Sequence, residues 1–145
     1  MKGPQKITRV HLDVNDQDEP SVFGIVTADP DYKFTLKLNR KLHILLKAFD
    51  PVKIRDNEGK ELIFSKFSDK KGAPELVFDL FSNRSGKNFL VKKLENVDFL
   101  FMVHDHEKNW QSEDLTTQLR EIDNVTAVFN LDFKTLKDKN LKYLI

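Results

Sequence analysis

Cysteine is absent from the sequence. Disulfide bonds, thiolate nucleophiles and cysteine-ligated metal sites are therefore excluded. Glycine and proline are sparse, with five of each, and the chain has no low-complexity segment and no internal repeat. No apolar run approaches the roughly 20 residues of a membrane-spanning helix. What remains is a globular chain whose fold depends on its own hydrophobic core.

An excess of charge of one sign is also missing. The chain holds 24 lysines and arginines against 23 aspartates and glutamates, for a net charge of +1. Binders of nucleic acid or of membrane surfaces usually carry a concentrated basic field, so neither partner is expected. The segment 1–6 lacks the apolar stretch of a signal peptide, which predicts a cytoplasmic protein.

The core is rich in phenylalanine. Twelve of the 145 residues are phenylalanine, and hydrophobic residues make up 39% of the chain. A chain of this length fits one ordinary domain and buries roughly 70% of its unfolded surface. The composition therefore predicts a single domain over residues 1–145.

Two helices are indicated by start signals and apolar spacing. Asp29 is the expected cap of the first helix and Pro30 its first position, with the helix running over about 31–42. Tyr32, Leu36, Leu38 and Leu42 make its expected buried stripe, and Phe34 falls off that stripe. Ser112 is the expected cap of the second helix, whose buried stripe is Leu115, Leu119 and Ile122.

Alternating or β-branched apolar runs, separated by turn residues, predict the strands. The run 97–103 is the most apolar and is the expected central strand, and Gly24 is expected to mark a bulge or a close backbone approach. Tight turns between consecutive strands favour an α+β fold, with a mostly antiparallel sheet and two main helices packed on one face. The predicted strands are 7–14, 22–27, 52–55, 62–67, 76–81, 88–91, 97–103 and 125–131, and the segment 44–49 is either a strand or the packed end of the first helix.

The order of elements resembles a known family. The Asp31-Tyr32 helix that leads to Leu38-Asn39, the strand end Leu80-Phe81-Ser82-Asn83 and the stretch 90–99 resemble the IPExxxVDY proteins, an uncharacterised bacterial family. Val97-Asp98-Phe99 is close to Val-Asp-Tyr, but Val91-Lys92-Lys93 stands where Ile-Pro-Glu is expected. The resemblance implies the same fold and a bacterial cytoplasmic origin, and it implies no activity.

Two histidines near the end of the central strand form a candidate metal site. In an extended chain, residues two apart point to the same side, so His104 and His106 could bind one Zn²⁺, with Glu107 or Asp13 as a third ligand. Too few further ligands lie at the required spacing, because His11 and His43 are distant in sequence. A polar loop that leaves the strand is the simpler interpretation, and no metal or cofactor is expected.

Asp98 is a carboxylate inside the most apolar run. A buried carboxylate needs partners, or its pKa rises. Asp98 could act as a general base, point to solvent on an open sheet face, or form a structural pair, for which Arg84 is a plausible partner. The segment 83–87 resembles a phosphate loop only superficially, because it lacks the first glycine and precedes a strand. A hairpin turn is the stronger interpretation.

No convergent set of nucleophile, base and oxyanion donors is visible, and no catalytic residue is assigned. The leading hypothesis is a non-catalytic binding or protein-interaction domain, whose partner is another protein or a second copy that uses the apolar end 141–145. The alternative is a nucleic-acid-associated module, because lysines and phenylalanines alternate around Lys66-Phe67, Lys70-Lys71 and 87–89 and could stack bases on one sheet face.

Overall fold

The computed structural model describes residues 20–70, 76–105 and 112–144. The predicted strand at 7–14 lies outside these residues. Within the described part, the α+β fold and the antiparallel sheet are confirmed. None of the described helices is long and apolar enough to span a membrane.

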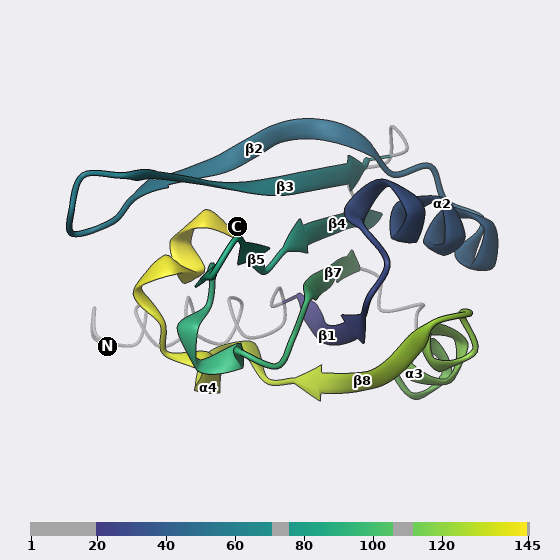
Figure 1. Cartoon of the computed structure of the whole chain (residues 1–145). Coiled ribbons are helices and arrows are strands. Elements are labelled where there is room, and N and C mark those ends of the chain that lie inside the picture. The colour runs from purple at the N-terminus through teal and green to yellow at the C-terminus, as the bar shows by residue number, and fades with distance from the viewer. Residues whose placement is uncertain (1–19, 71–75, 106–111, 145) are drawn as a thin grey trace, which may run out of the picture.

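Six strands form one sheet in the order β2-β3-β4-β7-β1-β8, with β2 and β8 at its two margins (Figure 1). Every neighbouring pair is antiparallel. The predicted central strand is confirmed, because β7 lies between β4 and β1. The strands are β1 (Ser21–Thr27), β2 (Lys47–Arg55), β3 (Glu61–Asp69), β4 (Leu76–Ser82), β7 (Phe99–Asp105) and β8 (Val125–Leu131).

The predicted strand at 88–91 is shorter in the structure. Only Asn88–Phe89, strand β6, is paired, and it joins Arg84–Ser85, strand β5, in a separate two-stranded sheet. Gly86 lies in the turn with φ 60°, a left-handed conformation that glycine adopts at little cost. The predicted hairpin turn at 83–86 is thus shifted toward the C-terminus by about two residues.

Helix α2 spans Asp31–Leu42, the predicted bounds, but its cap and its buried face differ from the prediction. Pro30 is the N-cap and no side chain caps the helix, whereas Asp29 binds Lys37 and Asn124. Phe34 is fully buried because its ring stacks on Phe99 of β7, with ring centroids 5.0 Å apart. Tyr32 and Leu36, from the predicted stripe, are exposed, and the buried residues of α2 are Phe34, Thr35, Leu38 and Leu42.

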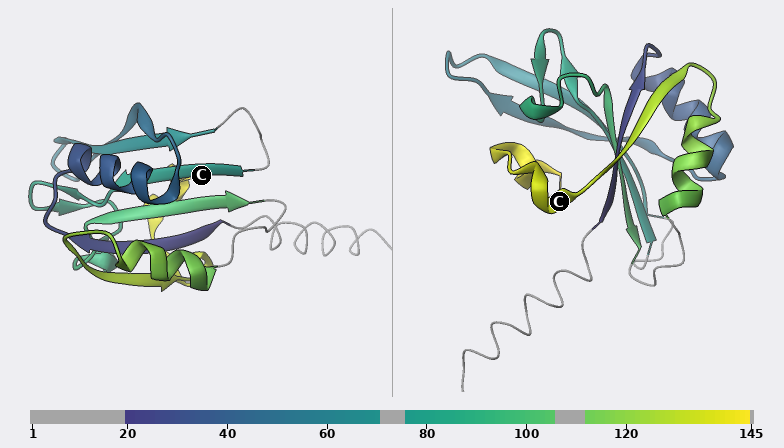
Figure 2. Two further views of the ribbon diagram at one scale, coloured as in Figure 1. Left: turned by 90° about the vertical axis from the view of Figure 1, so that its right-hand side faces the viewer. Right: turned by 90° about the horizontal axis from the view of Figure 1, so that it is seen from below.

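Helix α3 (Ser112–Arg120) packs beside β8 on the same side of the sheet as α2 (Figure 2). The predicted stripe of Leu115, Leu119 and Ile122 is confirmed as buried. The core on this side joins both helices to alternate residues of the central strands, such as Phe99 and Phe101 of β7. Two main helices on one face were predicted and are present.

The opposite sheet face is covered rather than open. Three short helical turns lie on this side, namely η1 (Lys92–Leu94), α4 (Phe133–Leu136) and η2 (Lys139–Tyr143) (Figure 2). Leu144 is 2% exposed and packs in a second core with Leu100 and Met102 of β7. The apolar C-terminal residues through Leu144 are therefore internal core, which removes them as the expected dimer surface.

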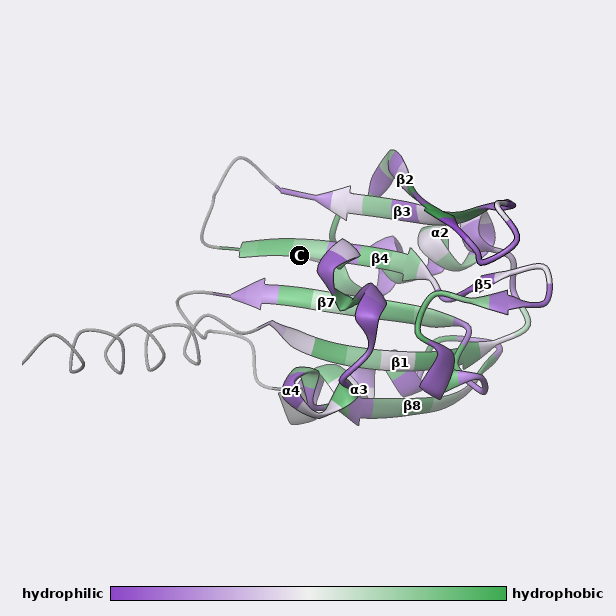
Figure 3. Cartoon of the chain, turned by 90° about the vertical axis from the view of Figure 1, so that its left-hand side faces the viewer, coloured by the Kyte–Doolittle hydropathy of each residue, from purple (hydrophilic) through white to green (hydrophobic). Residues whose placement is uncertain are grey.

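β4 and β7 carry the apolar stretches that serve both cores, and Figure 3 shows them as the most hydrophobic ribbons beneath the C-terminal segment. Gly24 of β1 faces this second core. A Cβ atom there would lie 3.1 Å from Leu131 and 3.1 Å from Val97. Gly24 is therefore a site of close approach, but by two side chains rather than by backbone, and the predicted alternative of a bulge is not found there because the register shift lies between Val26 and Thr27.

Candidate functional site

Asp98 and Arg84, the two polar residues singled out in the sequence, lie together. Arg84 Nε donates to Asp98 Oδ1, and its Nη2 donates to the carbonyl of Glu95 at 3.1 Å. Asp98 Oδ2 accepts the backbone N–H of Thr27 at 3.0 Å. Asp98 immediately precedes β7, and its two carboxylate oxygens are both satisfied. The structural alternative, a pair with Arg84, is the one that the geometry supports.

Asn83, the residue before Arg84, was not predicted as a polar centre. Its side chain is fully buried at the end of β4. Its Oδ1 accepts the N–H of Val91 at 2.8 Å, and its Nδ2 donates to the carbonyls of Leu94 and Val97, both at 2.9 Å. All three partners belong to the connection between β6 and β7, so one amide group fixes that connection.

His104 does not stand alone at the end of β7. Its Nε2 lies 3.3 Å from Asp79 Oδ2 on β4, and Asp79 Oδ1 accepts a hydrogen bond from Ser68 Oγ on β3 at 2.7 Å. Burial raises the pKa of Asp79, but the hydrogen bonds from His104 and Ser68 and the charge of Lys66 outweigh it and hold this pKa below its ordinary value of 3.8. The aspartate is therefore an anion anchored on three strands.

This cluster does not have the geometry of a nucleophilic triad. The carboxylate sits between the serine and the histidine, so the imidazole does not accept the proton of the Ser68 hydroxyl. Among the described residues, no group of three or more histidines, aspartates or glutamates could hold a metal ion. His106, Glu107 and Asp13 lie outside those residues, so the candidate zinc site at His104 and His106, which the sequence analysis did not favour, is not tested.

The phenylalanines of the predicted stacking face point mostly inward, whereas Lys70 and Lys87 are exposed and Lys71 lies outside the described residues. Phe67 packs against the helix-side core, and the guanidinium of Arg84 covers the ring of Phe89, 4.8 Å from its centroid. Lys66 lies over the rings of Phe49 and Phe81, at 5.0 and 5.3 Å, and Phe81 is fully buried. Few free aromatic faces remain here for bases to stack on.

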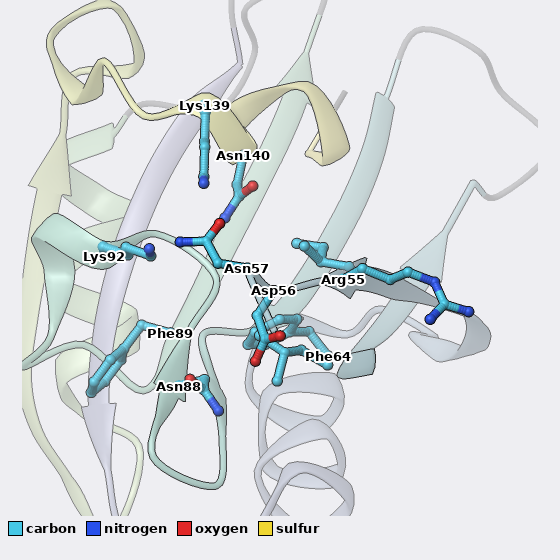
Figure 4. A pocket seen from close by; sticks show the side chains of 11 residues that line it. Arg55, Asp56, Asn57, Phe64, Asn88, Phe89, Lys92, Lys139 and Asn140 are labelled. Atoms are coloured by element: carbon cyan, nitrogen blue, oxygen red, sulfur yellow. The ribbon is translucent and has the colours of Figure 1, made fainter. Parts of the chain in front are cut away.

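A pocket of about 90 Å³ lies on the sheet face that the C-terminal turns cover, between the β2–β3 hairpin, β6 and η2 (Figure 4). Its apolar floor is formed by Phe64, which is fully buried, with Ile54 and Leu62 beside it. Its polar wall carries three amide side chains, from Asn57, Asn88 and Asn140. Such a mixture of an apolar floor and a few polar groups is typical of ligand sites.

Two lysines from separate elements lie at the mouth of this pocket. Lys92 begins η1 and Lys139 begins η2, and in Figure 4 both ammonium groups point toward Asn57, whereas Arg55 points away. Within the described parts of the chain, no carboxylate lies within 4 Å of either ammonium. The pocket therefore presents two positive charges without a paired anion.

One carboxylate, that of Asp56, itself lines the pocket, and both it and Asp138 accept backbone N–H groups. Asp56 Oδ1 accepts the N–H groups of Glu58 and Lys60 inside the hairpin turn. Asp138 Oδ2 accepts the N–H of Lys92 at 3.0 Å, and its Oδ1 accepts the N–H of Asn140 at 2.8 Å. Asp138 thereby ties η1 to η2 and fixes the distance between the two elements that carry the lysines.

Asn140 completes the wall. It is 6% exposed, and its Nδ2 donates to the carbonyl of Leu90 at 2.7 Å. The pocket combines segments about 50 and about 85 residues apart in sequence, which is why periodicity and motif spacing did not reveal it. The only local signal was the polar turn at 56–59, which the sequence analysis assigned to a hairpin.

No protein-family model matches this sequence, and no curated protein matches it either.

Proposed function

We propose that this chain is a non-catalytic binding domain, and that the pocket beside the β2–β3 hairpin takes the anionic group of a small ligand, such as a phosphate or a carboxylate. The observation that carries the proposal is the convergence of Lys92 and Lys139 on one pocket without a carboxylate partner in the described residues. Two ammonium groups held by different elements attract an anion more strongly than either group alone.

The uncharged part of the wall supports the same chemistry. Amide groups such as those of Asn57 and Asn88 can donate to anionic oxygens. The apolar floor at Phe64 fits a short carbon skeleton rather than a second charge. The lining of the pocket includes no serine, threonine, cysteine or histidine, which favours binding without reaction.

The test is a titration followed by NMR, with inorganic phosphate and acetate added separately at low ionic strength, because salt screens exposed charges. We expect the amide signals around Asn57, Asn88 and Asn140 to shift together and to saturate. The double variant Lys92→Ala/Lys139→Ala is expected to lose these shifts. A stronger response to phosphate or to acetate identifies the preferred anionic group.

The matched control removes two lysines from the same two turns. Lys93 in η1 and Lys142 in η2 are exposed and do not line the pocket. The double variant Lys93→Ala/Lys142→Ala carries the same net charge as the pocket variant and is expected to bind like the parent chain. Equal weakening in both double variants would mean diffuse attraction to a basic surface and would contradict the pocket.

The predicted alternative of a nucleic-acid-associated module has less support, because Phe67 and Phe81 turn inward. Its test is the binding of a short single-stranded RNA, which would weaken steeply as salt rises. Such binding, retained in the Lys92→Ala/Lys139→Ala variant, would favour the alternative over the pocket. The resemblance to the IPExxxVDY family and the bacterial cytoplasmic origin that it implies stay predictions.

A further inference from the structure

The pocket beside the β2–β3 hairpin is lined by charges of both signs. Lys92 and Lys139 carry the positive charges, and Asp56 carries a negative charge at the start of the hairpin turn. In Figure 4 the Asp56 carboxylate lies toward Phe64, whereas the two ammonium groups lie on the other side of Asn57. The two signs of charge are therefore separated within one pocket.

The hairpin turn holds the Asp56 carboxylate in a fixed orientation and leaves one of its oxygens without a partner. Oδ1 accepts the backbone N–H groups of Glu58 and Lys60, at 2.9 and 2.8 Å. Among the residues that the structure describes, no group donates a hydrogen bond to Oδ2 and no cation lies within 4 Å of the carboxylate. Asp56 can therefore accept a hydrogen bond from a positively charged donor on a ligand.

A ligand with only an anionic group fits this pocket less well than a ligand with both signs of charge. Its anion, bound by the two lysines, brings a second negative charge into the space that Asp56 lines, and like charges repel. The volume of about 90 Å³ leaves little room to separate them, and it is far below the roughly 300 Å³ of the smallest pockets for drug-sized ligands. A positive group on the same small molecule removes the repulsion.

We propose that the ligand of this pocket is a small amino acid with an apolar side chain. Lys92 and Lys139 bind its carboxylate, and Asp56 binds its ammonium group. The apolar floor of Phe64 and Ile54 contacts its side chain. This inference rests on the proposed function, because it assigns the anionic group of that proposal to the carboxylate of an amino acid.

The test is an NMR titration of the full chain with ligands that share one branched carbon skeleton. L-Valine has both charged groups, isovalerate lacks the ammonium group, and isobutylamine lacks the carboxylate. We expect the amide signals around Asn57 and Asn88 to saturate at about tenfold lower concentration of L-valine than of isovalerate, the usual effect of one hydrogen bond to a charged group. Isobutylamine is expected to bind most weakly, because the two lysines repel it.

The variant Asp56→Asn removes the negative charge and keeps an oxygen that can accept the N–H groups of Glu58 and Lys60, so the hairpin turn should remain. Thermal unfolding checks this. We expect Asp56→Asn to bind L-valine and isovalerate about equally. The matched control is Glu58→Gln, which removes one negative charge from the same turn at an exposed side chain outside the pocket lining. This control is expected to keep the preference for L-valine.

The possible results separate this inference from the proposed function. If the parent chain binds L-valine and isovalerate equally, the amino-acid assignment is wrong and the site for an anionic group stands. A preference for L-valine that survives in Asp56→Asn, or that is also lost in Glu58→Gln, would overturn the assignment too, because contact with the Asp56 carboxylate would not be its cause. If neither L-valine nor isovalerate gives saturable shifts, both proposals are wrong.

Discussion

At the residue scale, the buried side-chain amide of Asn83 holds the connection between β6 and β7 in place. It satisfies one N–H and two carbonyls of the β6–β7 connection and has no contact with solvent. The backbone of Asn83 adds two more hydrogen bonds, to the carbonyl of Asp98 and from the N–H of Leu90. This density of bonds indicates a structural role rather than a catalytic one.

We predict that Asn83→Ala lowers the free energy of unfolding by about 3 kcal/mol, because it leaves several buried backbone groups without partners. Asn83→Asp is expected to be equally harmful, since a carboxylate would face the carbonyls of Leu94 and Val97. Urea denaturation measures both, with Asn96→Ala, at an exposed position in the same connection, as the control. A loss of unfolding free energy no larger than that of Asn96→Ala would show that the fold does not need the amide of Asn83.

A second residue-scale prediction concerns Asp79 and pH. Because its pKa is lower in the folded chain than in the unfolded chain, the carboxylate adds stability above the unfolded-state pKa of about 3.9. This contribution is lost as the pH falls from there through the lower folded-state pKa. Asp79→Asn is therefore expected to be less stable than the parent at pH 7, by about 1–2 kcal/mol.

The measurement is the unfolding free energy of both chains across the acid range. The unfolding free energies of the parent and of Asp79→Asn are expected to converge as the pH falls. Protonated Asp79 is neutral, as asparagine is at every pH, so the charge-dependent part of the difference disappears. Ser68→Ala removes one hydrogen-bond donor but keeps the charge, and serves as the comparison. A constant difference between Asp79→Asn and the parent over the whole pH range would argue against a charge-dependent contribution.

At the element scale, the C-terminal turns act as the cover of the second core. Leu144 contacts the apolar side of the sheet that the two main helices leave bare, and Asp138 and Asn140 tie η2 to the β6–η1 region. Leu100 and Met102 of β7 belong to the core that this segment helps to cover. The segment is thus part of the domain and does not form a separate tail.

We predict that Leu144→Ala costs about 2–4 kcal/mol, the usual range for a buried leucine in a packed core. A chain that ends at residue 140 should lose more unfolding free energy than Leu144→Ala, because Leu141 and Tyr143 also pack against this core. Thermal unfolding compares both with Lys142→Ala, an exposed change in the same turn. A truncated chain as stable as the parent would mean that the second core needs no cover.

At the scale of the whole molecule, two cores share one sheet. Alternate residues of β7 serve them, with Phe99, Phe101 and Val103 on the helix side and Leu100 and Met102 on the C-terminal side. Successive side chains of a strand point to opposite faces. Unfolding of β7 therefore disrupts both cores at once.

We therefore predict one cooperative unfolding transition for the described fold. Phe101→Leu, on the helix side, and Met102→Ala, on the other side, should each shift the same single transition to lower denaturant concentration. Far-UV circular dichroism and the NMR signals of both cores are expected to follow one curve in the parent and in both variants. Separate transitions for the two sides would show that they are independent units.

Local patterns were sufficient for the elements whose signals are strong and short-range. The bounds of α2, the hairpin turn at 56–59 and the central position of 97–103 follow from spacing, turn residues and continuous apolarity. The buried face of α2 did not follow, because Tyr32 and Leu36 have the same four-residue spacing as Phe34 and Leu38. Contact with Phe99 selects between the two faces.

The sequence by itself determined the class of this protein, a cysteine-free and nearly neutral α+β domain with an antiparallel sheet. Composition is a count over the chain, and periodicity relates only residues that are close in sequence, so neither requires the tertiary structure. Only the tertiary structure decided that Leu144 is core, that Lys92 and Lys139 line one pocket and that β8 lies at a margin of the sheet that the described residues form. These features join residues far apart in the chain, and the order of the strands places them.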